Sequence, residues 1–261
     1  MPRISNQQAL RQEVMRQCPE VAPAVIAELF EQLDAEYFRL FSSAEIAAHA
    51  RLIATVNETQ PVALQVTPGD PLHADMLLVT YDFFGEFSLI TGLMAAYGLN
   101  IRAGQVFSYQ RGPGRTTPWG STTGGYIVDA FTVAYAPEQP FDQAAQRRFV
   151  AQLSSLVDLL RQGKLPEARA TLNYQLLEAI RTSLQGFSAH LFPVEIQLDN
   201  ETSPDWTIVD IHADDTPAFL YSLSNALAMR NMYIYRVTIT STQGKVHDQL
   251  CLGCRHGGKI T

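Results

Sequence analysis

The feature that most constrains the fold is an internal repeat. The segment PVALQV recurs downstream as PVEIQL, and FGEFSLITGLMAAYGLNIRAGQVFS recurs as PAFLYSLSNALAMRNMYIYRVTITS. A shift of 133 residues places Asp82 on Asp215. The final strands match at a shift of 119, which places Asp129 on Asp248, because the first copy carries a loop that the second lacks. A repeat of this length with matched strand order predicts two similar domains.

Each copy has the pattern strand, strand, helix, strand, strand. In the first copy, alternating apolar residues predict strands over 61–66, 74–82, 100–110 and 125–135, and GEFSLITGLMAAYG predicts a helix of about three turns. The stretch RGPGRTTPWGSTTG, rich in Gly, Pro, Ser and Thr, predicts a long loop between the last two strands. Short spacings and right-handed connections make each copy a small antiparallel sheet of the ferredoxin type with a helix on one face. The predicted fold class is therefore α+β.

Helical segments flank the two copies. The stretch PAVIAELFEQLDAEYFRLF (23–41) has an apolar stripe at helical spacing, and Ser42 and Glu45 follow at the spacing of a capping box. Residues 141–186 predict two helices that are separated within GKLPE by its glycine and proline. The second copy lacks the helix that follows the first, so we expect the natural chain to continue past Thr261. The predicted parts are an N-terminal helical segment (1–58), a first repeat domain (59–140), a helical connector (141–188) and a second repeat domain (189–261).

Composition and charge argue against several classes of protein. The 261-residue chain is 46% hydrophobic and 17% charged, as in globular proteins. Its formal net charge of −7, with no cluster of Lys and Arg, argues against nucleic acid or an anionic membrane as a partner. The sequence shows no signal-peptide core and no uncharged apolar run of the roughly 18 residues that a membrane span requires. Three cysteines give no disulfide framework, which makes a reducing cytoplasm the simplest location.

The sequence contains no convincing catalytic or metal-binding motif, and we expect no cofactor. CLGCRH supplies Cys251, Cys254 and His256 at a zinc-like spacing, but a closed tetrahedral site needs a fourth ligand and no second Cys pair exists. The adjacent pair His247 and Asp248 cannot build a metal site that needs several separated ligands. We interpret both motifs as structural.

Two further features leave alternatives open. His49 lies beside an apolar helical face, where a histidine is either structural or a ligand or acid–base group, and the structural role is favoured. The loop over 111–125 contains Arg111 and Arg115 but lacks the Lys-Ser/Thr of a phosphate-binding loop. It is either a hairpin tip or a surface that faces a partner or ligand.

The order of motifs in the first copy resembles an ACT domain. DFFG (82–85), a helix, GLNI (98–101), a strand and YIVDAF (126–131) follow the pattern D-x-P-G, helix, G-L-N-I, strand and a late D-x-F. The second copy is a weaker match. Tandem ACT domains separated by helices, with SSAEIAAHARLI in front, are similar to the C-terminal half of the bacterial PII uridylyltransferases.

The resemblance implies a ligand site, because ACT domains bind small molecules, usually amino acids, at an interface between two such domains. A glycine such as Gly85 lets the backbone approach a ligand, Asn100 can donate and accept hydrogen bonds, and Asp82 can receive an ammonium group. As alternatives, the glycines are turn residues and Asp82 is a helix cap. The candidate ligand-binding residues are Asp82, Phe84, Gly85, Glu86, Phe87, Asn100 and Ile101 in the first copy, and Asp215, Ala218 and Tyr233 in the second.

The chain also departs from the ACT pattern. Phe84 stands where the family usually has proline, and Glu86 adds a negative charge beside the expected carboxylate site. In the second copy Ala218 replaces the glycine, and its Cβ together with bulky Tyr233 can fill a pocket. We therefore expect the second copy to be a structural partner.

Two functions follow from the resemblance. The first is a regulatory module that binds an amino acid, with glutamine favoured, and controls a nucleotidyltransferase in the same polypeptide or in a separate one. The family's catalytic signature, a Gly-Ser followed by paired aspartates, and its phosphohydrolase domain are not found in this sequence. The second is a structural or oligomerisation module whose ACT pockets bind no ligand. In either case a homodimer through the edges of the ACT sheets is a candidate assembly.

Overall fold

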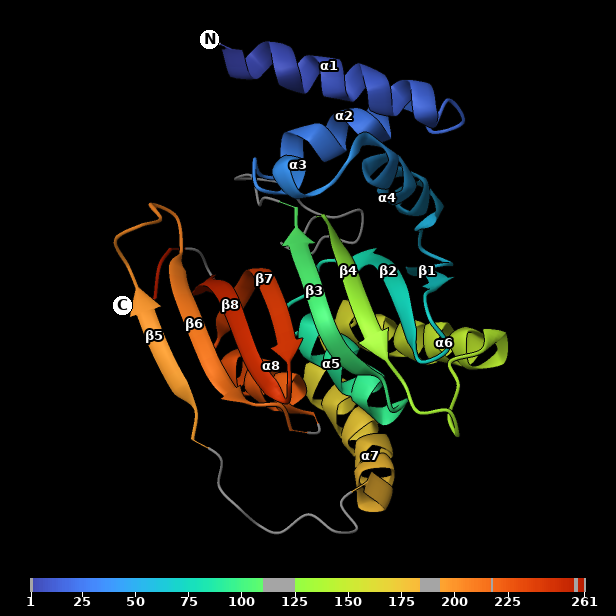
Figure 1. Cartoon of the computed structure of the whole chain (residues 1–261), viewed down its shortest axis with the longest axis vertical. Helices are drawn as coiled ribbons and strands as arrows, with labels where there is room; N and C mark the ends of the chain where they lie inside the picture. Colours follow the sequence, from blue (N-terminus) through green and yellow to red (C-terminus); the bar gives the residue numbers. More distant parts are fainter. Residues whose placement is uncertain (1, 110–124, 184–192, 217, 256–257, 261) are drawn as a thin grey trace. The chain divides into compact units, whose positions relative to one another are not determined.

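The computed structural model describes residues 2–109, 125–183, 193–216, 218–255 and 258–260 (Figure 1). These residues belong to two compact units. The N-terminal unit comprises 1–65, 77–82 and 107–128, and the repeat unit comprises 66–76, 83–106 and 129–261. The strands of the first copy contribute residues to both units.

The N-terminal unit begins with four helices, α1 (Pro2–Gln17), α2 (Pro23–Gln32), α3 (Tyr37–Leu40) and α4 (Ser43–Thr55). The apolar stripe over 23–41 is divided between two helices, because α2 ends at Gln32 and Leu33 is extended. The carboxylate of Asp34 accepts a hydrogen bond from the backbone N–H of Tyr37 at 3.0 Å and starts a new helix there. The predicted capping box of Ser42 and Glu45 is confirmed at the start of α4.

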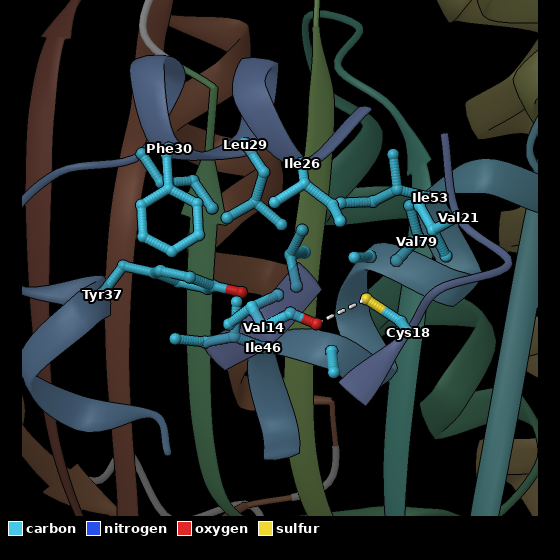
Figure 2. Close-up of a cluster of buried hydrophobic side chains, with 14 of the residues drawn as sticks. Val14, Cys18, Val21, Ile26, Leu29, Phe30, Tyr37, Ile46, Ile53 and Val79 are labelled. Atoms are coloured by element: carbon cyan, nitrogen blue, oxygen red, sulfur yellow. Dashed lines mark hydrogen bonds between the residues drawn. The ribbon is translucent and has the colours of Figure 1, made fainter. Parts of the chain in front are cut away.

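The core of this unit is formed by the helices together with residues from the strands, including Val79 (Figure 2). Phe107 and Val128 belong to the same core. The thiol of Cys18 is buried there and donates to the carbonyl of Val14 at 3.0 Å. A cysteine in such a setting is a small hydrophobic residue in the core and not a disulfide partner.

The strands of both copies form one eight-stranded sheet in the order β1-β2-β4-β3-β7-β8-β6-β5. The two halves, β1-β2-β4-β3 and β5-β6-β8-β7, have the same order, and each has one helix between its second and third strands in the sequence. The predicted α+β class with two ferredoxin-like halves is confirmed by this topology. The first-copy strands are β1 (Val62–Pro68), β2 (His73–Tyr81), β3 (Asn100–Ser108) and β4 (Tyr126–Ala134), and the second-copy strands are β5 (Glu195–Asp199), β6 (Thr207–Asp214), β7 (Met232–Thr242) and β8 (Lys245–Cys254).

The helices of the repeat unit are α5 (Glu86–Ala96), α6 (Gln143–Arg161), α7 (Leu165–Ser183) and α8 (Phe219–Met229) (Figure 1). The predicted break at GKLPE is confirmed, with Gly163 in the left-handed conformation at φ 73°. A Cβ on Gly92 of α5 would lie 2.6 Å from Leu172 of α7 and 2.7 Å from Tyr221 of α8, so three helices meet at this glycine. None of the helices in the described ranges is long and apolar enough to cross a membrane. The four-part division of the chain stays a prediction.

Candidate functional site

Two cavities lie at corresponding places between the two copies, both within the repeat unit. Each is formed by the loop that leads into the helix of one copy and the helix-to-strand step of the other. The cavities differ greatly in size. The large cavity has a volume of about 370 Å³ and the small cavity about 10 Å³, which is the space of a single water molecule.

The first copy lines the large cavity with the GLNI step. Gly98 ends α5 in the left-handed conformation at φ 67°, and the N–H of Leu99 bonds back to the carbonyl of Met94 at 2.9 Å. This glycine turn sends the chain directly into β3. It leaves Leu99 buried and Asn100 exposed at the wall of the cavity, followed by Ile101.

The second copy lines the large cavity with the residues around the start of α8. Asp215 and Thr216 follow β6, and Ala218 then caps α8 without a side-chain hydrogen bond. Ala218 has φ 59°, a left-handed conformation that glycine adopts without strain and that alanine adopts at a cost of about 1 kcal/mol. The first turn of α8 therefore reaches the cavity, and the N-terminal end of a helix attracts carboxylates.

Two carboxylates face this space. Asp215 accepts a hydrogen bond from the hydroxyl of Ser241 at 2.6 Å and lies 3.4 Å from the guanidinium of Arg102. Asp248, on β8, is 1% exposed and accepts the backbone N–H of Thr240 at 3.2 Å. The pKa of Asp248 is raised to about 6, mainly by burial and to a smaller degree by the negative charge of Asp215, while the hydrogen bond from Thr240 opposes the shift. The large cavity is thus mainly apolar with carboxylates at one part of its wall.

The small cavity is closed by side chains. Gly85 has φ 88° at the start of α5, and a Cβ there would lie 3.1 Å from Leu165. Tyr233, which occupies the position of Asn100 in the second copy, is buried with its ring 4.5 Å from that of Tyr235. The guanidinium of Arg255 lies 4.4 Å from the centre of the Phe84 ring. These aromatic groups leave no room for a small molecule.

The candidate ligand-binding residues are divided between the two cavities. In each copy, some candidate residues line the large cavity and others line the small one. The large cavity contains Asn100, Ile101, Asp215 and Ala218, and the small cavity contains Phe84, Gly85, Glu86, Phe87 and Tyr233. Asp82 lines neither cavity. It is buried in the N-terminal unit, where its backbone N–H donates to the carbonyl of Gly125 at 3.0 Å. Gly85, not Asp82, is the N-cap of α5.

Sequence reasoning missed Tyr221 and Asp248 as lining residues of the large cavity. Tyr221 carries no motif, and its hydroxyl bonds to Asn173 of α7. Asp248 has two features in the sequence, a neighbouring histidine and a match to Asp129 in the repeat, and neither was taken as a ligand contact. Its equivalence to Asp129 in the repeat was the available signal, because it placed an aspartate on the strand next to the expected site.

The cysteine motif lies in part outside the described residues, since His256 is not among them. Cys251 is buried on β8, and the thiol of Cys254 donates to the carbonyl of Lys259 at 3.3 Å. Within the ranges that the structure describes, no three potential ligands gather to hold a metal ion. Residues 110–124, which include Arg111 and Arg115, also lie outside the described ranges.

The chain is similar to curated bacterial proteins named bifunctional uridylyltransferase/uridylyl-removing enzyme. Identity is 27% over 228 residues to the protein of Rhodospirillum rubrum, 24% over 227 residues to that of Cereibacter sphaeroides and 29% over 167 residues to that of Ruegeria pomeroyi. The matches cover 86%, 86% and 64% of this chain, respectively, and 22%, 22% and 16% of the relatives. The chain thus spans about a fifth of their length.

Other comparisons add little. No protein-family model matches the chain. Among solved structures, aspartate kinase from Synechocystis aligns with 12% identity and a TM-score of 0.29, over 71% of this chain and 25% of that one. The chain is thus similar in sequence to part of these uridylyltransferase/uridylyl-removing enzymes, and its repeated ferredoxin-like topology agrees with the predicted resemblance to tandem ACT domains.

Proposed function

We propose that the chain is a regulatory module that binds an amino acid in the large cavity and controls a nucleotidyltransferase, in the same polypeptide or in a separate one. The observation that carries the proposal is the cavity itself. Its volume of about 370 Å³ lies within the range of small-molecule sites, and it is lined by the GLNI step of one copy and the start of α8 in the other. Glutamine is the favoured ligand because of the resemblance to the uridylyltransferases.

The lining suggests how an amino acid is held. The first turn of α8 offers backbone N–H groups to the α-carboxylate. Asn100, which the first copy contributes to the wall, can donate to and accept from a side-chain amide. Each copy therefore supplies half of one site, and the second copy does more than support the first. We place this module in the cytoplasm.

A thermal and calorimetric screen tests the proposal. Melts of the full chain against the twenty amino acids should show a selective rise in midpoint, because a ligand at 100 times its Kd stabilises the protein by about 2.7 kcal/mol. Isothermal titration should then show weaker binding to Asn100→Ala. The matched control is Gln249→Ala, since Gln249 is an exposed amide on β8 that bonds to Asp210 and does not line the cavity.

The alternative function is a structural or oligomerisation module without a ligand. Two observations favour it, namely the closed small cavity and the exposed apolar residues of β5, including Ile196 and Leu198. If no amino acid at millimolar concentration shifts the melt, the sensor proposal is overturned and this alternative stands. Self-association through the β5 edge is compatible with both functions, and we propose it as the assembly.

A further inference from the structure

Asp248 is a buried carboxylate on the core-facing side of β8. Leu250, two residues further along β8, points into the same layer and is fully buried, as expected for a core strand. A carboxylate in that layer loses hydration and needs a compensating partner. Asp248 receives one backbone N–H, from Thr240, and also lines the wall of the large cavity.

The charged and titratable groups around Asp248 do not supply a cation to it. Asp215, from the loop after β6, opposes its ionisation. Arg102 of β3 forms its ion pair with Asp215, and Tyr221 of α8 directs its hydroxyl to Asn173. Among the described residues, no ion pair includes Asp248.

The remaining titratable neighbours point away. His247 precedes Asp248 on β8 and is exposed, so it lies on the opposite face of the sheet. Its ring stacks on that of His212, 4.1 Å away. The large cavity is therefore the side from which a positive charge can reach Asp248.

We propose that Asp248 recognises the ammonium group of the ligand, which makes a cationic nitrogen a requirement for binding in the large cavity. This inference rests on the proposed function and identifies the ammonium group of the amino acid as a group that the site must bind. The ammonium also lies near Asp215, whose charge Arg102 already offsets in part. Asp129, the equivalent of Asp248 in the first copy, is buried as well but lines neither of the two cavities.

The inference carries a dependence on pH. The pKa of Asp248 is raised to about 6 in the ligand-free protein, and only the ionised carboxylate attracts an ammonium group. Affinity should therefore rise as the pH increases through this value and become constant above it. The Asp248→Asn variant should lose this dependence, because the amide does not titrate in that range, whereas Asp129→Asn should keep it.

The decisive experiment compares three ligands by isothermal titration of the full chain at neutral pH. L-glutamine carries carboxylate, amide and ammonium, glutaramate lacks the ammonium, and 4-aminobutanamide lacks the carboxylate. We expect glutaramate to bind at least about tenfold more weakly than glutamine, the loss that one charge-assisted hydrogen bond predicts. The Asp248→Asn substitution should weaken the binding of glutamine by a similar factor, whereas Asp129→Asn should leave the affinity for glutamine unchanged.

The outcomes separate the inference from the proposed function. If glutamine binds and glutaramate binds equally well, the role of Asp248 is overturned while the sensor function stands. The same conclusion follows if Asp248→Asn binds glutamine with unchanged affinity and an unchanged pH profile. If none of the twenty amino acids binds, the proposed function fails and the inference fails with it. The ligand comparison uses the unaltered protein, so a folding defect in a variant cannot obscure the result.

Discussion

At the scale of single residues, His49 shows how burial decides the chemistry of a group. It is 3% exposed in the N-terminal unit, and its Nδ1 lies 2.5 Å from the hydroxyl of Tyr37. Burial lowers the pKa of His49 to about 4, although the negative charge of Glu45 opposes the shift. The neutral ring accepts the hydrogen bond of the tyrosine, and the structural role favoured by the sequence agrees with this setting.

This histidine makes stability depend on pH in a defined direction. The pKa is depressed in the folded protein, so between about pH 6.5 and 4 the unfolded chain binds a proton that the folded chain does not. Stability is fully present above pH 6.5 and is lost as the pH falls. Relative to His49→Gln, the unaltered protein should lose about 2 kcal/mol of unfolding free energy between about pH 7.5 and 5. Urea unfolding at both pH values measures this.

The control for that measurement is Ser155→Ala, because Ser155 is exposed on α6 and has no titratable side chain. The pH dependence of the unfolding free energy of this variant should match that of the unaltered protein. A His49→Gln protein with the same profile as the unaltered one would show that the buried histidine is protonated in the folded state, contrary to this prediction.

At the scale of elements, the packing of α5 against α7 and α8 depends on Gly92. Alanine there would improve helix propensity by about 1 kcal/mol, but its Cβ would lie 2.6 Å from Leu172 and 2.7 Å from Tyr221. We expect Gly92→Ala to lower the unfolding free energy by roughly 1 kcal/mol net, since overpacking costs 1–3 kcal/mol. Ligand affinity should also fall, because Tyr221 lines the large cavity.

Thermal melts and titration calorimetry measure the two effects of Gly92→Ala. Ser155→Ala is the matched control, because Ser155 is exposed on α6 and bonds only to the backbone of its own helix. A Gly92→Ala protein that is more stable than the unaltered one would mean that the three helices separate at this contact without cost.

The elements themselves could largely be predicted from the sequence, whereas their combination into a site could not. Alternation and periodicity are properties of short stretches of sequence. The strands, the capping box of Ser42 and the break at GKLPE could therefore be predicted from the sequence. The break between α2 and α3 was missed because it depends on one side chain, that of Asp34. The distribution of Asn100 and Gly85 between different cavities depends on β3 lying beside β7, which no local pattern encodes.

At the scale of the whole molecule, repetition of the fold does not bring repetition of the site. The two copies present corresponding cavities, yet one has about 370 Å³ and the other about 10 Å³. The difference follows from substitutions in the repeat, in particular Tyr233 at the position of Asn100. Of these two cavities, only the large one has room for the proposed ligand, and residues of both copies line it.

The edge of the sheet gives the last prediction, which concerns assembly. β5 is the final strand in the sheet order, and its Ile196 and Leu198 are 55% and 69% exposed. An exposed apolar edge invites pairing with another strand. Two β5 strands from different chains can pair in antiparallel fashion about Ile196. Leu198 of one chain then faces Val194 of the other, and Glu195 faces Gln197, so that no like charges meet.

We therefore expect the protein to self-associate and Leu198→Lys to shift it toward the monomer, because a charge would replace an apolar contact at the paired edge. Sedimentation velocity across a dilution series measures the change. Leu177→Lys is the matched control, since Leu177 is 68% exposed on α7 and not on the edge strand. A protein that stays monomeric throughout the series, or one that both substitutions dissociate equally, would contradict pairing through β5.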